Sequence, residues 1–266
     1  MKKLAILVLG IAALSAFAGT CVVQNTKLTE IDGDKTLGGE IKNDTDVDFL
    51  AHKVLVAFLD GDNNVLQTKS VEGCLRSLQS GTSDFFAAAS TEDPDDVEKT
   101  LQRLDFSGLK VGQTVDGELN YSSIEITRNE DSLVVTGNIK NDGSNDLEDV
   151  RVCAVVRDED GKVLTVFRGS AFDLDEDATK AFSLTVNVVD DVDDVATVDL
   201  WADGTDPNED DAPIDPQSDL DNDVEVCDDP ATNTPTPTGT LTPTNTPTAT
   251  TTPPTATNTP VDTACD

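Results

Sequence analysis

Acidic residues between positions 219 and 225 have the alternating spacing of calcium-binding loops. Asp219, Asp221, Asp223 and Glu225 would fill the first, third, fifth and seventh places of such a loop. Calcium takes about six to eight oxygen ligands, and carboxylates supply them. The sixth place lacks the usual glycine, and Pro230 stands at the twelfth place instead of glutamate. The segment therefore predicts a candidate calcium site on an incomplete loop.

A second acidic group offers another candidate site. Its four closely spaced carboxylates are Asp190, Asp191, Asp193 and Asp194. The same composition is also typical of a solvated acidic surface that keeps an exported protein soluble. The sequence therefore suggests either no cofactor or calcium.

Catalytic chemistry has little support in the sequence. The chain has a single histidine, His52, and no Gly-rich phosphate loop, no H-E-x-x-H and no G-x-S-x-G motif. Carboxylates occur throughout, so no one pair of them indicates acid–base catalysis. We therefore expect a protein that is not an enzyme.

The charge of the chain excludes one large class of partner. Asp and Glu number 52 against 18 Lys and Arg, which gives a formal net charge of −34 over 266 residues. Proteins that bind nucleic acids gain most of their affinity by neutralising phosphates with basic side chains. We therefore expect no nucleic-acid partner, and an anionic membrane surface is disfavoured for the same reason.

The N-terminus indicates export. Two lysines follow Met1, residues 4–14 are apolar, and Ala16 and Ala18 form a small-x-small cleavage pattern. The apolar run is shorter than the roughly 20 residues that span a bilayer. Residues 1–18 are therefore predicted to be a signal peptide of a secreted or cell-surface protein, with no transmembrane segment after it. Cys21 offers an alternative, a lipid anchor.

Export permits disulfides, but the cysteines do not reveal their pairing. Their number is odd and their spacing is wide: Cys21, Cys74, Cys153, Cys227 and Cys265. Cys153 lies in an apolar strand pattern, where a small buried hydrophobic residue is favoured over a reactive thiol.

The C-terminal segment has a different composition from the rest of the chain. Residues 232–260 contain 15 Thr and 7 Pro and no charged residue. Such a segment cannot bury enough apolar surface to offset the entropy of ordering. We expect 232–266 to be a disordered Thr/Pro-rich tail, preceded by an acidic linker at 209–231.

An internal repeat organises the middle of the chain. The sequence Gly-Glu-Ile-Lys-Asn-Asp from Gly39 returns as Gly-Asn-Ile-Lys-Asn-Asp from Gly137, and in this 98-residue register 11 of the 28 positions from 39 to 66 are identical to those from 137 to 164. The copies are predicted to be two domains, 19–116 and 117–208. In each, the glycine should permit a close backbone approach and the Asn-Asp pair should form a turn.

Both copies read as β-structure. Short β-branched runs alternate with turn residues, which is typical of an antiparallel sandwich. The expected strands are 54–59, 133–140, 150–156, 163–167, 181–189 and 195–201. One segment, 95–104, has its apolar residues at helical spacing and could hold a short helix. The fold class is therefore all-β: two tandem sandwich domains followed by a disordered tail.

These residues carry a resemblance to a known family. The Gly-x-Ile-Lys-Asn-Asp motif, the acidic loop after it, the strand from Val54 to Asp60 and the turn before Val65 resemble FxLYD-type secreted prokaryotic immunoglobulin-like modules. The literal signature is degenerate in both copies. The resemblance implies an immunoglobulin-like β-sandwich without catalytic residues.

A function class follows from compartment, composition and resemblance together. We expect a secreted or cell-surface, non-enzymatic protein that acts in display, adhesion or binding, with an extracellular protein or glycan as its partner. The first alternative is a calcium-binding or calcium-stabilised extracellular module. The second is an accessory carbohydrate-binding protein, for which Tyr121 and Trp201 are the available aromatic platforms.

Overall fold

The fold is nearly all β, as expected. The computed structural model describes residues 20–105, 110–112, 117–129, 132–187, 195–208, 212–214 and 216–223. Within these ranges no helix is long and apolar enough to cross a membrane. The predicted signal peptide at 1–18 and the predicted tail at 232–266 lie outside the described residues.

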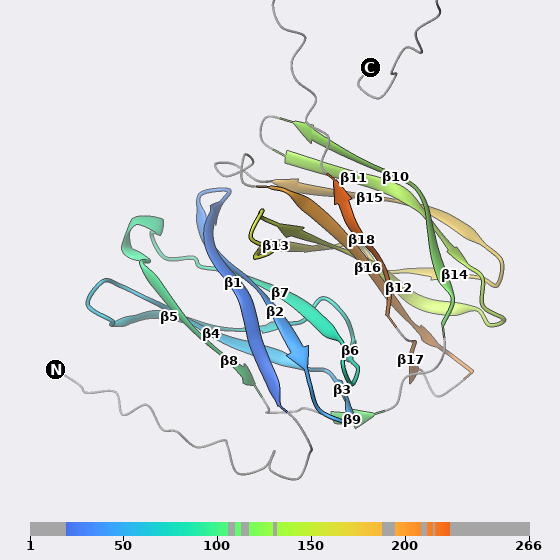
Figure 1. Cartoon of the computed structure of the whole chain (residues 1–266), viewed down its shortest axis with the longest axis horizontal. Coiled ribbons are helices and arrows are strands. Elements are labelled where there is room, and N and C mark those ends of the chain that lie inside the picture. The colour runs from blue at the N-terminus through green and yellow to red at the C-terminus, as the bar shows by residue number, and fades with distance from the viewer. Residues whose placement is uncertain are drawn as a thin grey trace, which may run out of the picture. The chain divides into compact units, whose positions relative to one another are not determined.

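Repeat 1 contains two three-stranded sheets that face each other across a core. One has the order β1-β2-β7 and the other β5-β4-β8 (Figure 1). Phe49, Val56, Phe58 and Phe86 are among the buried residues between them. A small third sheet has the order β6-β3-β9. The strands are β1 (Cys21–Ile31), β2 (Asp34–Asn43), β3 (Asp48–Leu50), β4 (Lys53–Leu59), β5 (Val65–Glu72), β6 (Ser77–Leu78), β7 (Ser83–Ala89), β8 (Lys99–Asp105) and β9 (Lys110–Gly112).

Repeat 2 has the same arrangement. Its sheets have the orders β10-β11-β15 and β13-β12-β16, and they enclose a core that includes Leu133, Ile139, Val152 and Leu200. The strands are β10 (Leu119–Asn129), β11 (Ser132–Asn141), β12 (Leu147–Arg157), β13 (Val163–Arg168), β14 (Phe172–Leu174), β15 (Thr179–Asn187) and β16 (Thr197–Asp206).

The 98-residue repeat is confirmed in detail. Strands β10 and β11 begin and end 98 positions after β1 and β2. The register of each hairpin shifts at the same place, between Gln24 and Lys27 in repeat 1 and between Ser122 and Glu125 in repeat 2. Each bulge holds a residue with positive φ, 49° at Asn25 and 54° at Ser123. The two copies therefore share backbone irregularities as well as strands.

The glycines and asparagines of the motif have the structural roles that the sequence predicts. A Cβ on Gly39 would lie 2.6 Å from the ring of Phe86, and one on Gly137 would lie 2.8 Å from the ring of Phe182. The buried amide of Asn43 donates to the carbonyls of Val47 and Leu78 and so fixes the loop that follows β2. In repeat 2 the amide of Asn141 donates in the same way to the carbonyls of Asn145 and Leu174.

The two repeats share one sheet. An edge strand of repeat 1, β1, pairs in parallel with an edge strand of repeat 2, β13, through Thr26 and Val163. Among the described residues this pairing gives the sheet order β17-β16-β12-β13-β1-β2-β7, in which β17 is a short strand (Ala212–Pro213). Both repeats accordingly lie in one compact unit that ends at Glu225, where the sequence suggested two independent domains.

Two segments differ from their expected structure. Residues 95–104 are not a helix: a short 3₁₀ turn (Pro94–Asp96) leads into strand β8. Val97 is buried, whereas Leu101 is 56% exposed, so the two do not share one apolar face. The expected linker at 209–231 contributes β17 (Ala212–Pro213) and β18 (Gln217–Asp223), both paired with β16, so this part of it belongs to the sheet.

Candidate functional site: the junction between the repeats

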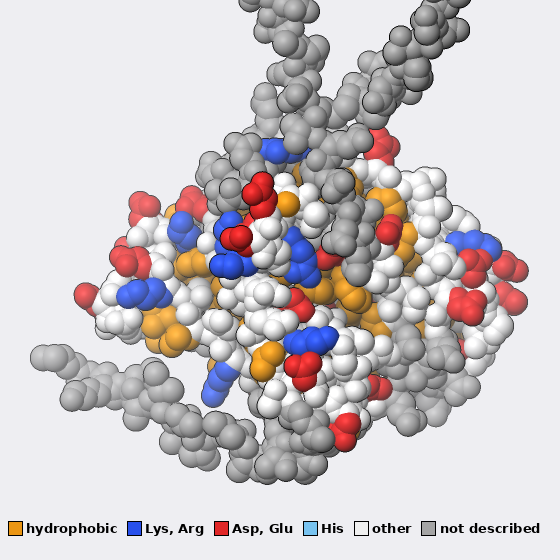
Figure 2. All heavy atoms as spheres, in the orientation of Figure 1, with side chains coloured by type: hydrophobic (Ala, Val, Ile, Leu, Met, Phe, Trp, Pro, Cys, Tyr) orange, Lys and Arg blue, Asp and Glu red, His pale blue; other side chains and the backbone are white. Residues whose placement is uncertain are grey.

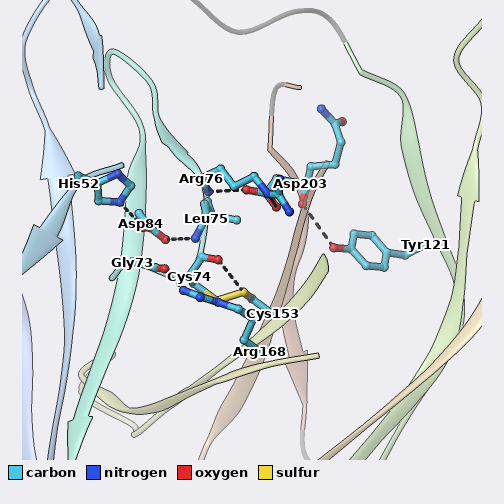
Figure 3. The surroundings of a disulfide bond; sticks show 11 residues. His52, Gly73, Cys74, Leu75, Arg76, Asp84, Tyr121, Cys153, Arg168 and Asp203 are labelled. Carbon is cyan, nitrogen blue, oxygen red and sulfur yellow. Dashed lines mark hydrogen bonds and ion pairs between the residues drawn. A yellow bond between two sulfur atoms is a disulfide. The ribbon is translucent and has the colours of Figure 1, made fainter. Parts of the chain in front are cut away.

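A disulfide joins the repeats. Cys74 follows β5 in repeat 1, Cys153 lies in β12 of repeat 2, and the two form a bond (Figure 3). Cys153 is fully buried, as the sequence predicts, and its sulfur is oxidised in the disulfide. Repeat spacing could not reveal this pairing, because the positions equivalent to Cys74 and Cys153 in the other copy are Phe172 and Leu55.

Apolar side chains surround the disulfide. The rings of Phe85 and Trp201 lie 5.4 Å apart between the repeats. Trp201 packs against a buried cluster that contains residues of both copies: Cys74, Leu75, Phe85, Cys153, Val155 and Val163. The junction thus has a small core of its own. One wall of it is the outward face of the β13-β12-β16 sheet.

Charged side chains close the rim of this core. Arg157 stacks over the ring of Phe85 at 5.1 Å, and its Nε donates to Asp199 at 2.6 Å. Arg157 and Asp199 both belong to repeat 2, whereas Lys27 and Asp158 form an ion pair across the junction, at 3.1 Å. Burial acts to raise the pKa of Asp158, but hydrogen bonds from the Lys162 backbone and from Lys27 outweigh it, so the pKa is lowered.

The single histidine of the chain is part of a buried hydrogen-bond network. His52 is buried, and its Nε2 hydrogen-bonds to the buried carboxylate of Asp84. The other oxygen of Asp84 accepts the backbone N–H of Leu75 at 2.9 Å. A Cβ on Gly73 would lie 1.7 Å from Asp84, so only glycine fits there. The pair therefore positions the 73–76 segment beside the disulfide, with Asp84 supplied from β7, 32 residues away.

A second buried carboxylate comes from repeat 2. Asp203 in β16 accepts the backbone N–H of Arg76, and the Arg76 Nε lies 3.9 Å from its other oxygen. The Arg76 guanidinium also donates to the carbonyl of Asp149, at 2.9 Å. Burial raises the pKa of Asp203 to about 6. Sequence patterns gave no signal for this contact, because Arg76 and Asp203 are 127 positions apart.

A hollow of about 370 Å³ opens beside the disulfide. Arg168 crosses it from repeat 2, where its guanidinium donates to the carbonyl of Gly73 (Figure 3). Glu72 supplies an anion, and the remaining walls are largely apolar: Val71, Cys74, Phe85, Phe86, Ala87 and Val166. The described lining of this hollow is therefore a contact surface with one anion and one cation.

The calcium candidates are not brought together among the described residues. Asp190, Asp191, Asp193 and Asp194 lie outside those ranges. Residues 219–223 lie in β18, a paired strand, where the spacing suggested a loop. Of the acidic side chains in that strand, only that of Asp219 is described; those of Asp221 and Asp223 are not. Within the described part of the chain, no three His, Cys, Asp or Glu side chains are placed to hold a metal ion.

The two candidate carbohydrate platforms are partly buried. Trp201 packs on Phe85 at the junction. The Tyr121 ring stands edge-on to Phe182, and its hydroxyl donates to the carbonyl of Gln217 in β18 at 3.4 Å. Burial, followed by the charges of Asp219 and Asp203, raises the pKa of Tyr121 well above its usual value. Both aromatic rings hold elements of the fold together.

Comparisons with known proteins add little. Neither protein-family models nor curated proteins give a match. Among solved structures the chain is similar to red sea bream transglutaminase (11% identity, TM-score 0.24, 79% of this chain and 31% of that one). It is also similar to a calcium-binding mutant of Bacteroides uniformis β-glucuronidase 2 (11%, 0.25, 74% and 28%) and to a Ruminococcus gnavus β-glucuronidase (12%, 0.23, 73% and 37%). The chain spans about a third of the length of these enzymes, and the likeness is too low to bear on function.

Proposed function

We propose that the chain is a secreted or cell-surface, non-enzymatic protein that acts in display, adhesion or binding through two FxLYD-type immunoglobulin-like repeats. The observation that carries the proposal is the Cys74–Cys153 disulfide between the repeats. Disulfides form and persist in oxidising compartments and are rare where thiols are kept reduced. The disulfide at the junction is therefore what we expect of an exported protein.

The packing of the junction supports a role in presenting a surface. A shared sheet, a disulfide and a buried cluster hold the two repeats in one arrangement. Binding to a surface that is already ordered costs less conformational entropy than binding to one that must be ordered. Figure 2 shows acidic side chains distributed over the visible face, with Lys and Arg side chains between them. Such a surface suits a protein that stays soluble outside the cell.

Cys21 bears on how the protein is attached. Its side chain is half-buried at the start of β1, and its Sγ donates to Asn43 at 3.3 Å. Burial, and then the charge of Asp44, raises the pKa of the Cys21 thiol to about 11. The side chain would have to leave this site in order to carry a lipid. A protein that is released after cleavage is therefore favoured over a lipid-anchored one.

Intact mass spectrometry of the protein from its producing cells tests the proposal. We expect a chain that begins after Ala18, found outside the cytoplasm, whose mass rises by about 2 Da on reduction for each disulfide. An uncleaved chain with reduced Cys74 and Cys153, recovered from the cytoplasm, would contradict the proposal. A mass increase at Cys21 equal to a diacylglyceryl group would establish the lipid-anchored form.

A further inference from the structure

The two repeats differ at one sheet edge. In repeat 2, β16 pairs with β12 on one side and with β18 on the other. In repeat 1 the equivalent strand, β8, pairs with β4, and the described residues place no strand of the ladder on its other edge. Repeat 1 cannot form its own counterpart of β18, because the residues at the corresponding positions, from 119 onward, already form β10.

The missing strand leaves β8 less covered than β16. In β16 the inward-facing Val198, Leu200 and Ala202 are completely buried, whereas their counterparts in β8, Thr100, Gln102 and Leu104, are only partly buried. On the outward row of β8, Leu101 is 56% exposed, more than any other large hydrophobic residue described. A strand with unpaired backbone groups and an exposed leucine is a template for a further strand.

The charges along β8 indicate what kind of strand would fit. The outward-facing side chains of β8 are Lys99, Leu101 and Arg103, so a basic residue lies on either side of an aliphatic one. The chain as a whole has a net charge of −34. Arg103 forms no ion pair within the described part of the chain, and Lys99 donates only to the turn at Gly61 and Asn63. Opposite charges on neighbouring strands stabilise their pairing.

Strand β18 shows the complementary pattern. Its acids alternate with other residues from Asp219 to Asp223, and it pairs antiparallel with β16, so that Asp223 lies opposite Thr197 and Ser218 opposite Trp201. In the same register on β8, Asp223 would lie opposite Lys99 and Ser218 opposite Arg103. Asp223 would thus face a cation on β8, Lys99, where it faces Thr197 on β16, while Asp219, opposite Leu200 in β16, would face Gln102.

We propose that the open edge of β8 is a docking site for an extended acidic segment of another protein, which adds to the β5-β4-β8 sheet as β18 adds to β16. The segment alternates carboxylates with small or aliphatic residues, and its backbone continues the ladder. This inference rests on the proposed binding function and names its partner chemistry. Strand addition of this kind takes affinity from backbone hydrogen bonds and specificity from alternate side chains.

Stacking of a second copy in the way that repeat 1 stacks on repeat 2 would use β5, the counterpart of β13, and not the edge of β8, and it is disfavoured in any case. At that junction Gly38 lies against β13, and a Cβ there would be 2.3 Å from the carbonyl oxygen of Val163. The equivalent residue of repeat 2 is Thr136, so its backbone cannot approach another module as closely. Lys27, which pairs with Asp158, is replaced by Glu125, which would face the acidic Asp60.

A synthetic peptide with the sequence of residues 216–223 is the probe. We expect one labelled peptide to bind per full-length mature chain in fluorescence anisotropy, with affinity that falls as salt is added. The double change Lys99→Glu with Arg103→Glu should weaken binding roughly tenfold or more, since the basic outward row of β8 would become acidic and repel an acidic peptide. The matched control Lys162→Glu, at an exposed turn of repeat 2, should leave binding unchanged.

N-methylated peptides separate strand addition from simple charge attraction. Alternate backbone N–H groups of an added strand point toward its partner, so methylation at one alternate set should abolish binding and methylation at the other set should not. Equal binding by both methylated peptides, or binding that survives the double charge reversal, would overturn the proposal. Absence of peptide binding to a chain that is exported and disulfide-bonded would overturn it too, while leaving the proposed function intact.

Discussion

The backbone N–H of Arg76 in repeat 1 donates to the buried carboxylate of Asp203 in repeat 2, so the two copies share a charged group inside their junction. Burial is the main reason that the pKa of Asp203 is raised to about 6, and the neighbouring Asp84 raises it further, whereas Arg76 and Arg151 lower it. The Asp203 carboxyl therefore gains or loses its proton near pH 6. This gives the junction a dependence on pH that surface carboxylates lack.

Asp203 should make the protein more stable at pH 4.5 than at pH 7, relative to a variant without this carboxyl. Between its ordinary pKa of 3.8 and its folded pKa of about 6, the folded chain holds a proton that the unfolded chain has lost. Stability from this group therefore falls as pH rises through that window, by up to about 3 kcal/mol. Urea unfolding of the wild type and of Asp203→Asn measures the difference. A difference that is constant from pH 4.5 to pH 7 would contradict the assignment.

Other carboxylates make stability rise with pH, so the comparison with Asp203→Asn is needed to isolate the contribution of Asp203. Burial acts to raise the pKa of Glu40, but hydrogen bonds from Ser83, Asn25 and Gln24 outweigh it and lower the pKa. Its stabilisation is present above its ordinary pKa of 4.5 and is lost as pH falls through the lower, folded value. Subtracting the variant from the wild type cancels this contribution.

Removing the inter-repeat disulfide should destabilise the protein strongly. The double change Cys74→Ser with Cys153→Ser frees a loop with a sequence separation of 79, and a disulfide across such a loop typically contributes about 2–5 kcal/mol. Thermal unfolding should show a midpoint several degrees lower. Cys21→Ser, which removes a thiol outside the disulfide, is the matched control and should change the midpoint far less.

Gly38→Ala should loosen the junction. The added Cβ would lie 2.3 Å from the carbonyl oxygen of Val163 and 2.7 Å from that of Leu164, and these backbone atoms cannot move without shifting β13. We expect a loss of about 1–3 kcal/mol in unfolding free energy, with faster proteolytic cleavage between the repeats. Thr136→Ala, at the equivalent position of repeat 2, is the control. Equal stability of the two variants would show that β2 and β13 are not in close contact.

Calcium and sodium should stabilise the protein equally if the acidic segments are only a solvated surface. Screening of a chain with net charge −34 depends on ionic strength and not on which cation supplies it. Melting temperatures at matched ionic strength test this. An excess of several degrees with millimolar calcium would instead establish specific coordination. Asn substitution of Asp190, Asp191, Asp193 and Asp194, or of Asp219, Asp221 and Asp223, would then locate the site.

The repeat and its strands could be predicted because they depend on local chemistry. Gly39 and Asn43 return at Gly137 and Asn141, and in both copies the glycine lies against a phenylalanine ring and the asparagine donates to a leucine carbonyl. The prediction of a helix at 95–104 was wrong because the apolar spacing of this segment fits a helix, whereas the segment contains β8, which pairs with β4. Tertiary pairing outweighs local periodicity at such places.

The junction could not be predicted because it occurs once. His52 and Asp84, Arg76 and Asp203, and Cys74 and Cys153 have no counterpart pairs at the 98-residue offset. Comparison of the copies therefore gave no signal for them. Their sequence separations are 32, 127 and 79 residues, too long for any local pattern to join them.

The disulfide also limits how far the chain can stretch when its ends are pulled apart. Force applied at the two termini cannot extend the segment between Cys74 and Cys153 while the bond is intact, because the load passes through the two sulfur atoms. At about 3.4 Å per residue, a separation of 79 residues corresponds to roughly 27 nm of withheld length. Under mechanical load an oxidised chain is therefore a short tether, and a reducing agent would lengthen it in a single step.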